Sequence, residues 1–465
     1  MIKKRLSDES LFYCARFSLC NRGASSRIAF FAQRLSLQVA QLIAAHAVAE
    51  VLAGHNLTVS MPKALRKVKA ATPQQQAAAQ DYSYLTLRFY AESAAYLKAL
   101  TPKPVSDERV SALLLVALSQ LLHSSDDDFT VVNQAVEAAG KTGQRWAKGL
   151  VNAVLRNFLR QRADLQPQIA SREEVQFNYP QWWIDTLKQQ YPQDWRAILE
   201  IGNSHPPMTL RVNVRKTDVD AYMQWLQGAG IAARHLGGTA ILLEQPLPVH
   251  KLPHFEAGWI SVQDAGAQWA APLLDLQPGM RVLDACSAPG GKTCHLLETS
   301  NIELLSLDAE PERLRRVHEN LQRLGLQAKV VTGDAAQADW FDGQLFDRIL
   351  ADVPCSASGI VRRHVDMKWL RRPQDLATFA RTQQEILSNL WQMLAKGGKL
   401  LYVTCSIFQQ ENEMQIQQFL AAHTDAKRLP VAFDVSTLPC QHQLGGQLLP
   451  SAAHDGLFYA LLQKH

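Results

Sequence analysis

Two cysteines stand where two apolar, strand-like runs end. Cys355 follows "RILADVP" and Cys405 follows "LLYVT". Either cysteine alone is most simply explained as a packing residue. A thiolate is also a strong nucleophile, and ligands of parallel sheets bind at the carboxyl ends of the strands. Two thiols at one sheet edge therefore suggest covalent catalysis, but their positions do not say which of them attacks.

A glycine-rich turn precedes them in "DACSAPGGKT". It is no P-loop, because position 286 is Cys where that motif needs Gly, and G-x-G-x-x-G is absent. Asp308 ends the next predicted strand, where a carboxylate can bind ribose hydroxyls. An adenosyl ligand without a triphosphate fits both facts. The predicted cofactor-binding residues are Cys286, Ser287, Ala288, Pro289, Gly290, Gly291, Lys292, Asp308, Asp334 and Asp352.

The elements that must position these groups alternate regularly between strand and helix. The predicted strands are "MRVLDA", "ELLSLD", "AKVVTG", "DRILAD", "KLLYVT" and "LFYALLQ". The last long helix, "LATFARTQQEILSNLWQMLAKGG", is expected to close at Gly397 and Gly398. Apolar strands that alternate with helices predict an α/β, doubly wound, Rossmann-like domain over residues 256–465.

Three other segments precede this domain. Residues 36–160 are rich in Ala and Leu at helical spacing, which predicts an all-α bundle. Residues 161–255 are expected to hold a polar linker, "RADLQPQIASREE", and a small α/β insert. Residues 1–35 are expected to be a poorly ordered extension. The whole chain is therefore predicted to be multidomain.

Composition excludes several classes of protein. The first 35 residues hold seven Lys/Arg and two Asp/Glu, which accounts for the whole net charge of +5, so global charge argues for no partner. No apolar run is long enough to span a membrane. Seven cysteines without a Cys-x-x-Cys pair indicate neither a disulfide framework nor a zinc site, and no metal is expected. Free thiols favour the cytoplasm. Cys286 and Cys294 are expected to pack, and Cys14, Cys20 and Cys440 receive no role.

The motifs "DACSAPGGKT", "DVPCSASGIVRRHVDMKW" and "YVTCSIFQQENE" resemble those of the NOL/NOP/Sun family of RNA cytosine-5 methyltransferases. The segments "VVNQAVEAAGK" and "KGLVNAVLRNFLR" are similar to the NusB-like RNA-binding domain of a bacterial branch that acts on 16S ribosomal RNA. The resemblance covers residues 36–465. It implies S-adenosylmethionine as cofactor, Cys405 as the nucleophile on cytosine carbon 6, and Cys355 as the thiol that assists release. Asp352, at a strand end, is then placed to hydrogen-bond the N3/N4 edge of the cytosine ring.

RNA contacts are predicted directly after the Cys355 loop, where cations stand beside an aromatic residue. Two further residues lie in "LRVN", which resembles a family segment near the cleft. The predicted RNA-binding residues are Arg362, Arg363, His364, Lys368, Trp369, Arg211 and Asn213. We expect a monomeric 16S ribosomal RNA methyltransferase. A transfer RNA methyltransferase and a non-catalytic RNA-binding or antitermination factor are the alternatives.

Overall fold

The computed structural model describes residues 26–68, 71–431, 443–444 and 446–465, with side chains from Leu37 on outside residues 69–70 and 432–445. The expectation for residues 1–35 lies outside this part except that a helix begins at Ser26. The described residues form two compact units, residues 26–204 with 361–372 and residues 205–360 with 373–465. No helix in the described part of the chain is long and apolar enough to cross a membrane.

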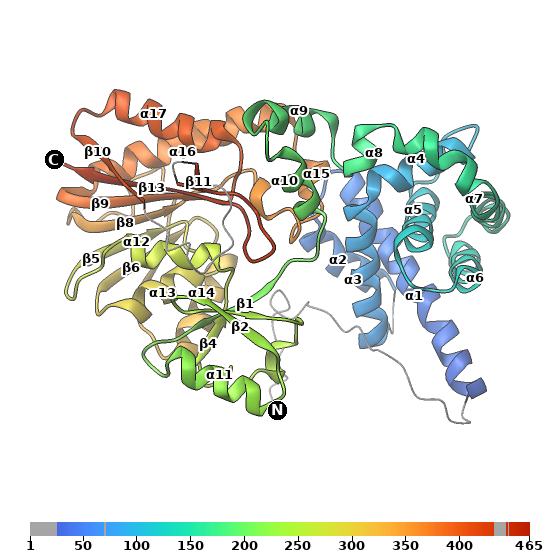
Figure 1. Ribbon diagram of the computed structural model, residues 1–465, viewed down its shortest axis with the longest axis horizontal. Coiled ribbons are helices and arrows are strands. Elements are labelled where there is room, and N and C mark those ends of the chain that lie inside the picture. Colours follow the sequence, from blue (N-terminus) through green and yellow to red (C-terminus); the bar gives the residue numbers. More distant parts are fainter. Residues whose placement is uncertain (1–25, 69–70, 432–442, 445) are drawn as a thin grey trace. The chain divides into compact units, whose positions relative to one another are not determined.

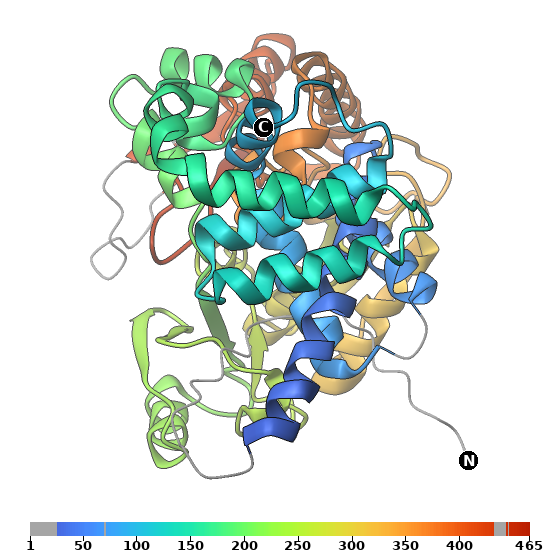
Figure 2. The ribbon, with the colours of Figure 1, turned by 90° about the vertical axis from the view of Figure 1, so that its right-hand side faces the viewer.

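The first unit is entirely helical, as predicted (Figure 1). Its helices are α1 (Ser26–Leu52), α2 (Leu57–Lys67), α3 (Pro73–Arg88), α4 (Tyr90–Leu100), α5 (Glu108–His123), α6 (Asp128–Ala139), α7 (Ala147–Ala170), α8 (Glu173–Phe177), α9 (Gln181–Gln190), α10 (Trp195–Gly202) and α15 (Met367–Leu370). Figure 2 shows α6 and α7 side by side on the face turned to the viewer.

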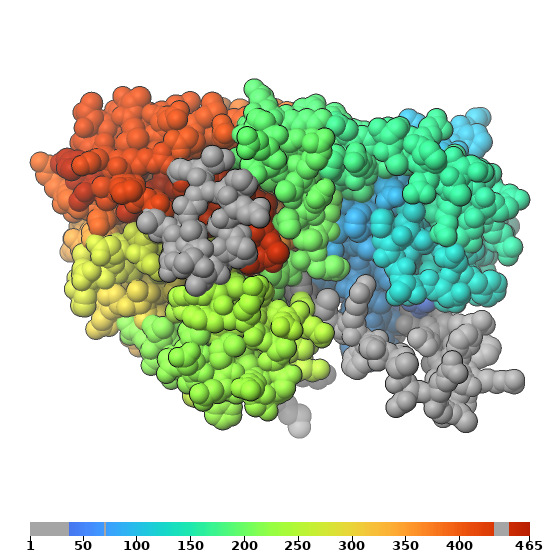
Figure 3. Space-filling view, in the orientation of Figure 1, coloured from blue at the N-terminus to red at the C-terminus, as the bar shows by residue number. Residues whose placement is uncertain are grey.

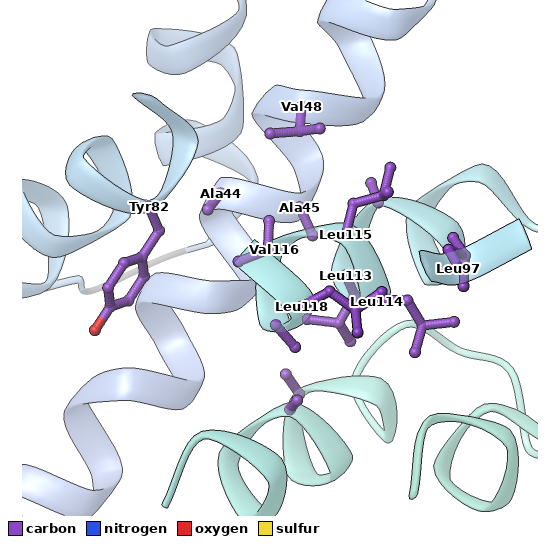
Figure 4. Close-up of a cluster of buried hydrophobic side chains, with 14 of the residues drawn as sticks. Ala44, Ala45, Val48, Tyr82, Leu97, Leu113, Leu114, Leu115, Val116 and Leu118 are labelled. Atoms are coloured by element: carbon purple, nitrogen blue, oxygen red, sulfur yellow. The ribbon is translucent and has the colours of Figure 1, made fainter. Parts of the chain in front are cut away.

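Apolar side chains at helical spacing build the core of this unit. α5 is central, because Leu113, Val116 and Leu118 are completely buried on it. Figure 4 shows these side chains in one buried cluster with Ala44 and Val48 of α1. Side-chain caps at Asn56, Thr72, Asp107 and Asp127 supply the missing backbone partners at the starts of α2, α3, α5 and α6. The expected linker "RADLQPQIASREE" is helical over most of its length, because α7 continues past Pro167 to Ala170 and α8 begins at Glu173.

The second unit begins with the predicted small α/β insert. Its antiparallel sheet has the order β2-β3-β1-β4. The elements are β1 (Met208–Val212), α11 (Val219–Gly228), β2 (Ala233–Gly237), β3 (Ala240–Leu243) and β4 (Ile260–Val262). Tyr222 and Leu226 of α11 are completely buried against the sheet. The opposite side of α11 lies at the surface, visible in green in Figure 3, and there Trp225 is exposed.

The larger sheet of this unit has the order β11-β12-β13-β9-β8-β5-β6-β7, with β10 paired to β13. Its strands are β5 (Arg281–Ala285), β6 (Glu303–Asp308), β7 (Lys329–Thr332), β8 (Phe346–Asp352), β9 (Leu394–Thr404), β10 (Ala426–Leu429), β11 (Gln443–Leu444), β12 (Gln447–Leu448) and β13 (Leu457–Lys464). β9, β8, β5, β6 and β7 are parallel, and β13 runs antiparallel to β9. The chain order reverses between β5 and β8, which is where ligands of such sheets bind.

Helices cover both faces of this sheet, so the predicted doubly wound α/β fold is confirmed (Figure 1). One face carries α12 (Ala270–Leu273), α13 (Gly291–Thr299) and α14 (Pro311–Leu324), and the other carries α16 (Pro373–Gln392) and α17 (Glu413–Ala422). One expectation was wrong: α16 ends at Gln392, and Gly397 and Gly398 lie within β9. The register between β8 and β9 shifts at this point, so the glycines accommodate an irregular strand start.

Candidate active site

The glycine-rich turn connects β5 to α13. Cys286 and Gly290 adopt left-handed backbone conformations, with φ of 61° and 94°. A Cβ at Gly290 would lie 3.0 Å from the Cα of Val317 on α14, so this position needs glycine on two counts. The turn therefore keeps little side-chain bulk at the carboxyl edge of the sheet, as its sequence indicates.

Carboxylates from the neighbouring strands lie at this turn. Asp308 ends β6, and its Oδ2 accepts a hydrogen bond of 3.0 Å from the Ala288 N–H. Asp284 of β5 is buried, and burial raises its pKa to about 7. Its Oδ2 accepts from Thr293, whereas Oδ1 has no protein partner among the described residues. Asp334 follows β7 and is exposed, with Oδ1 accepting the N–H of Ala336.

These residues fit an adenosyl ligand with an ammonium group. Asp308 keeps acceptor capacity for ribose hydroxyls beside a turn of low bulk. The unpartnered Oδ1 of Asp284 is a buried acceptor suited to a cationic donor. Sequence reasoning missed Asp284, although an acidic residue inside the apolar run "RVLDA" was a usable signal.

The two thiols meet at the same edge of the sheet. β8 and β9 are parallel neighbours, with Asp352 in register with Val403. The Sγ atoms of Cys355 and Cys405 lie 3.3 Å apart, and both residues are partly buried. The hydrogen bond to Cys405, followed by burial, raises the pKa of Cys355 well above its usual value. The protonated form of Cys355 is therefore favoured beside the sulfur of Cys405.

An ion pair stands beside the thiols. Lys292, at the start of α13, places its Nζ 2.7 Å from Oδ2 of Asp352. Burial alone would lower the pKa of Lys292, but the charge of Asp352 outweighs it and raises that pKa. Lys292 stays an ammonium group and orients Asp352. The ion pair therefore links the start of α13, next to the cofactor turn, to the end of β8, which leads into the Cys355 loop.

Cys286 of the turn and Cys294 of α13 pack, as predicted. Cys286 packs beside the sheet, and burial raises its thiol pKa. Cys294 is buried on α13, and burial raises its pKa to about 12. Ser287 Oγ accepts from Ser306 at 2.7 Å, and Pro289 is exposed. Cys14, Cys20 and Cys440 lie outside the described residues.

Four of the predicted RNA-binding side chains are buried and bonded within the protein. Arg211 pairs with Glu298 of α13 at 2.8 Å and also donates to the Gly291 carbonyl. Asn213 donates to the Gly258 carbonyl. Both residues therefore connect the small sheet to its neighbours instead of facing solvent.

Arg362 and Lys368 are buried in the helical unit. Lys368 Nζ donates to the carbonyls of Arg88 and Asn178 and to Oδ1 of Asn203, at 2.8, 2.9 and 2.8 Å. All three ammonium protons are used, so no donor remains for a phosphate.

The other three predicted RNA-binding residues are Arg363, His364 and Trp369, which are half-buried. The indole N–H of Trp369 donates to the Leu87 carbonyl. Their part in RNA binding stays a prediction.

Comparisons with known proteins agree along the chain. Residues 38–160 match the NusB family, residues 179–250 match the ferredoxin-like domain of RsmF/B-like methyltransferases, and residues 271–463 match the model of 16S rRNA methyltransferase RsmB/F. The ribosomal RNA small subunit methyltransferase B of Pseudomonas syringae is 43% identical over 91% of this chain and 96% of its own length. That of Vibrio cholerae is 42% identical over 88% of this chain and 94% of its own length.

Among solved structures, a methyltransferase homolog protein from Pyrococcus horikoshii matches 63% of this chain and 97% of its own, with a TM-score of 0.54 and 26% identity. The two curated relatives cover nearly the whole chain at more than 40% identity. The chain belongs to the RsmB/F family of 16S rRNA methyltransferases, which use S-adenosylmethionine.

Proposed function

We propose that this protein methylates carbon 5 of a cytosine in small-subunit (16S) ribosomal RNA, through a covalent bond between Cys405 and cytosine carbon 6. The proposal rests on one observation: two thiols 3.3 Å apart at the strand ends, beside the Lys292–Asp352 ion pair. The relatives are named for acting on small-subunit ribosomal RNA, which supports this substrate. The expected location is the cytoplasm.

The chemistry needs a nucleophile because carbon 5 of cytosine is too weakly nucleophilic on its own. S-adenosylmethionine supplies an electrophilic methyl group when bound. The thiolate of Cys405 attacks carbon 6, and the electrons of the ring double bond become available at carbon 5. After transfer, a base removes the carbon-5 proton, the electrons of that C–H bond restore the carbon 5–carbon 6 double bond, and the Sγ–carbon 6 bond breaks so that Cys405 leaves as a thiolate. The target base must leave its stack to reach the sulfur.

The surroundings of the sulfurs support different roles for the two cysteines. Cys355 has a raised pKa and stays a thiol, which suits a group that serves release more than attack. Cys405 is its hydrogen-bond partner, with the two sulfurs 3.3 Å apart. Asp352, oriented by Lys292, can accept a hydrogen bond from the cytosine amino group.

Trapping of the covalent intermediate tests these roles. Cys405→Ala should abolish methyl transfer and form no adduct, whereas Cys355→Ala should attack but release slowly and accumulate a protein–RNA adduct, measured by denaturing electrophoresis. Cys294→Ala is the matched control and should behave as wild type, since Cys294 packs on α13. An adduct that appears with Cys405→Ala instead reverses the assignment.

The substrate is tested separately by mapping 5-methylcytosine in cells with and without the protein. Loss of one site in 16S ribosomal RNA is expected. Loss of a transfer RNA site, with 16S unchanged, favours the transfer RNA alternative. Unchanged methylation everywhere favours the non-catalytic one.

A further inference from the structure

A buried carboxylate lies between the two loops that carry the thiols. Glu411 is in a short 3-10 helix, Gln409–Glu411, just after β9, and is completely buried. Its Oε2 accepts hydrogen bonds of 2.5 Å from the hydroxyls of Ser356 and Ser406. Its Oε1 accepts from the Ser356 N–H at 2.7 Å and from Gln383 at 3.1 Å. Four donors thus converge on one side chain.

The two serines give this arrangement its meaning. Ser356 directly follows Cys355, and Ser406 directly follows Cys405. A single carboxylate oxygen therefore holds the residue next to each thiol. The two loops are joined further by a contact of 3.0 Å between the hydroxyls of Ser358 and Ser406. Hydrogen bonds to a buried carboxylate are short and strong, so the bonds from Ser356 and Ser406 to Glu411 fix one loop relative to the other.

Glu411 is itself held in place from behind. Its own carbonyl accepts the Tyr402 hydroxyl at 2.7 Å, and Tyr402 is completely buried on β9. Gln383 of α16 also donates to the Pro354 carbonyl, immediately before Cys355. β9 and α16 therefore hold the carboxylate in place. Such support is expected for a group that positions others.

The carboxylate also acts on the thiols electrostatically. The pKa of Cys355 is raised most by the hydrogen bond to Cys405, by burial and by the charge of Cys405. The charge of Glu411 raises it further. Burial raises the pKa of Glu411 itself, and the hydrogen bonds from Ser356 and Ser406 oppose that rise.

We propose that Glu411 is a positioning residue, which holds Cys355 and Cys405 at their mutual distance through the serine that follows each. This inference rests on the proposed two-thiol reaction and deepens it. An isosteric Gln loses the negative charge and one of the two acceptor oxygens, and its amide N–H₂ can face the hydroxyls of Ser356 and Ser406 only if both turn from donors into acceptors. The role is separate from chemistry on the substrate, since Glu411 acts only through the two serines.

The test compares Glu411→Gln with Glu413→Gln in the full-length protein. Glu413 lies two residues away on α17, is partly exposed and pairs with Arg428, so it is a matched control. Glu411→Gln should lower the single-turnover rate of methyl transfer about 100-fold or more, with little change in KM for either substrate. It should also move the alkaline side of the pH–rate profile to lower pH, because a negative charge near Cys355 is lost.

A second readout reports the thiol distance without any RNA. Mild oxidation with diamide should form the Cys355–Cys405 disulfide readily in wild type and Glu413→Gln, and at least about tenfold more slowly in Glu411→Gln. If Glu411→Gln does not fold, Ser356→Ala and Ser406→Ala each remove one donor to the same oxygen and should show the same changes more weakly.

The outcomes separate this inference from the proposed function. Wild-type rate, pH profile and disulfide formation in Glu411→Gln overturn the positioning role. A Glu411-dependent disulfide in a protein that makes no 5-methylcytosine overturns the proposed function and leaves the positioning role standing.

Discussion

Cys355 and Cys405 differ in what surrounds each sulfur, although both follow a strand and both precede a serine. The hydrogen bond between them, followed by burial, favours the protonated form of Cys355. A shared proton between two thiols lets one of them be the better nucleophile without a nearby histidine base. The ammonium group of Lys292, paired with Asp352, adds positive charge in the same corner of the site.

His295 on α13 makes the catalytic unit sensitive to acid. It is 6% exposed, and its Nδ1 has no protein partner among the described residues. Burial, then the charge of Arg211, lowers its pKa well below 6.5. Below pH 6.5, His295 is therefore protonated in the unfolded chain but stays neutral in the folded protein. The free energy of unfolding falls as the pH drops. At pH 5.5 this residue should cost about 1.4 kcal/mol relative to pH 7.5.

Urea unfolding at pH 7.5 and pH 5.5 measures this effect. His295→Gln should lose less stability between the two values than wild type, by about the same 1.4 kcal/mol. The matched substitution His250→Gln, at an exposed position, should retain the wild-type difference. Equal acid sensitivity of wild type and His295→Gln would sink this explanation.

At the scale of elements, the Cys355 loop crosses the segment before β13 backbone to backbone. Gly359 donates its N–H to the Cys405 carbonyl at 2.9 Å, and its own carbonyl accepts the Gly456 N–H at 2.9 Å. A Cβ at Gly359 would overlap the carbonyl oxygen of Gly456. Gly359→Ala should therefore destabilise the protein by about 1–3 kcal/mol and slow methyl transfer.

Gly228→Ala is the control for this prediction. Gly228 ends α11, and a Cβ there meets nothing within 4 Å. The substitution should be neutral or stabilising by about 0.4–1 kcal/mol, because it restricts the unfolded chain. Equal stabilities of the two variants in urea would refute the close crossing at Gly359.

Elements with a strong local signal could be predicted from the sequence. The apolar runs that became β5, β6 and β8 end within a residue of their expected limits. Because parallel strand ends share one edge, the meeting of both thiols followed from those limits. The pair Gly397 and Gly398 led to a wrong helix end, because glycines can close a helix but can also lie at an irregular point inside a strand, as they do in β9. Asp284 and Glu411 were missed because burial of a charge depends on partners from other elements.

Burial of four of the predicted RNA-binding side chains was also missed, because it too depends on partners from other elements. A cluster of cations beside a tryptophan has the composition of an RNA-binding loop whether or not it is exposed. Lys368 is buried by Arg88, Asn178 and Asn203, which lie 280, 190 and 165 positions away in sequence. No pattern within the loop could reveal partners at that distance.

At the scale of the whole molecule, one short segment belongs to a unit far from it in sequence. The chain leaves the catalytic unit after Ile360, contributes residues 361–372 to the helical unit, and returns at Pro373. Val365 is completely buried in the helical core, and Asp366 accepts the N–H that begins α2 at 2.8 Å. The helical unit is therefore incomplete without a segment that directly follows the Cys355 loop.

Residues 1–204 expressed alone should be less stable than the same residues fused to 361–372 by a flexible linker. Burial of Val365 contributes about 1.5–3 kcal/mol, and without Lys368 three acceptors in the unit lose their partner. The fusion should melt at least several degrees higher, as measured by the helical circular dichroism signal. A fusion with Lys368→Met should recover only part of that gain, because it restores the apolar contacts but leaves the acceptors unpaired. If both fusions melt at the temperature of the isolated fragment, residues 361–372 do not contribute to the helical core.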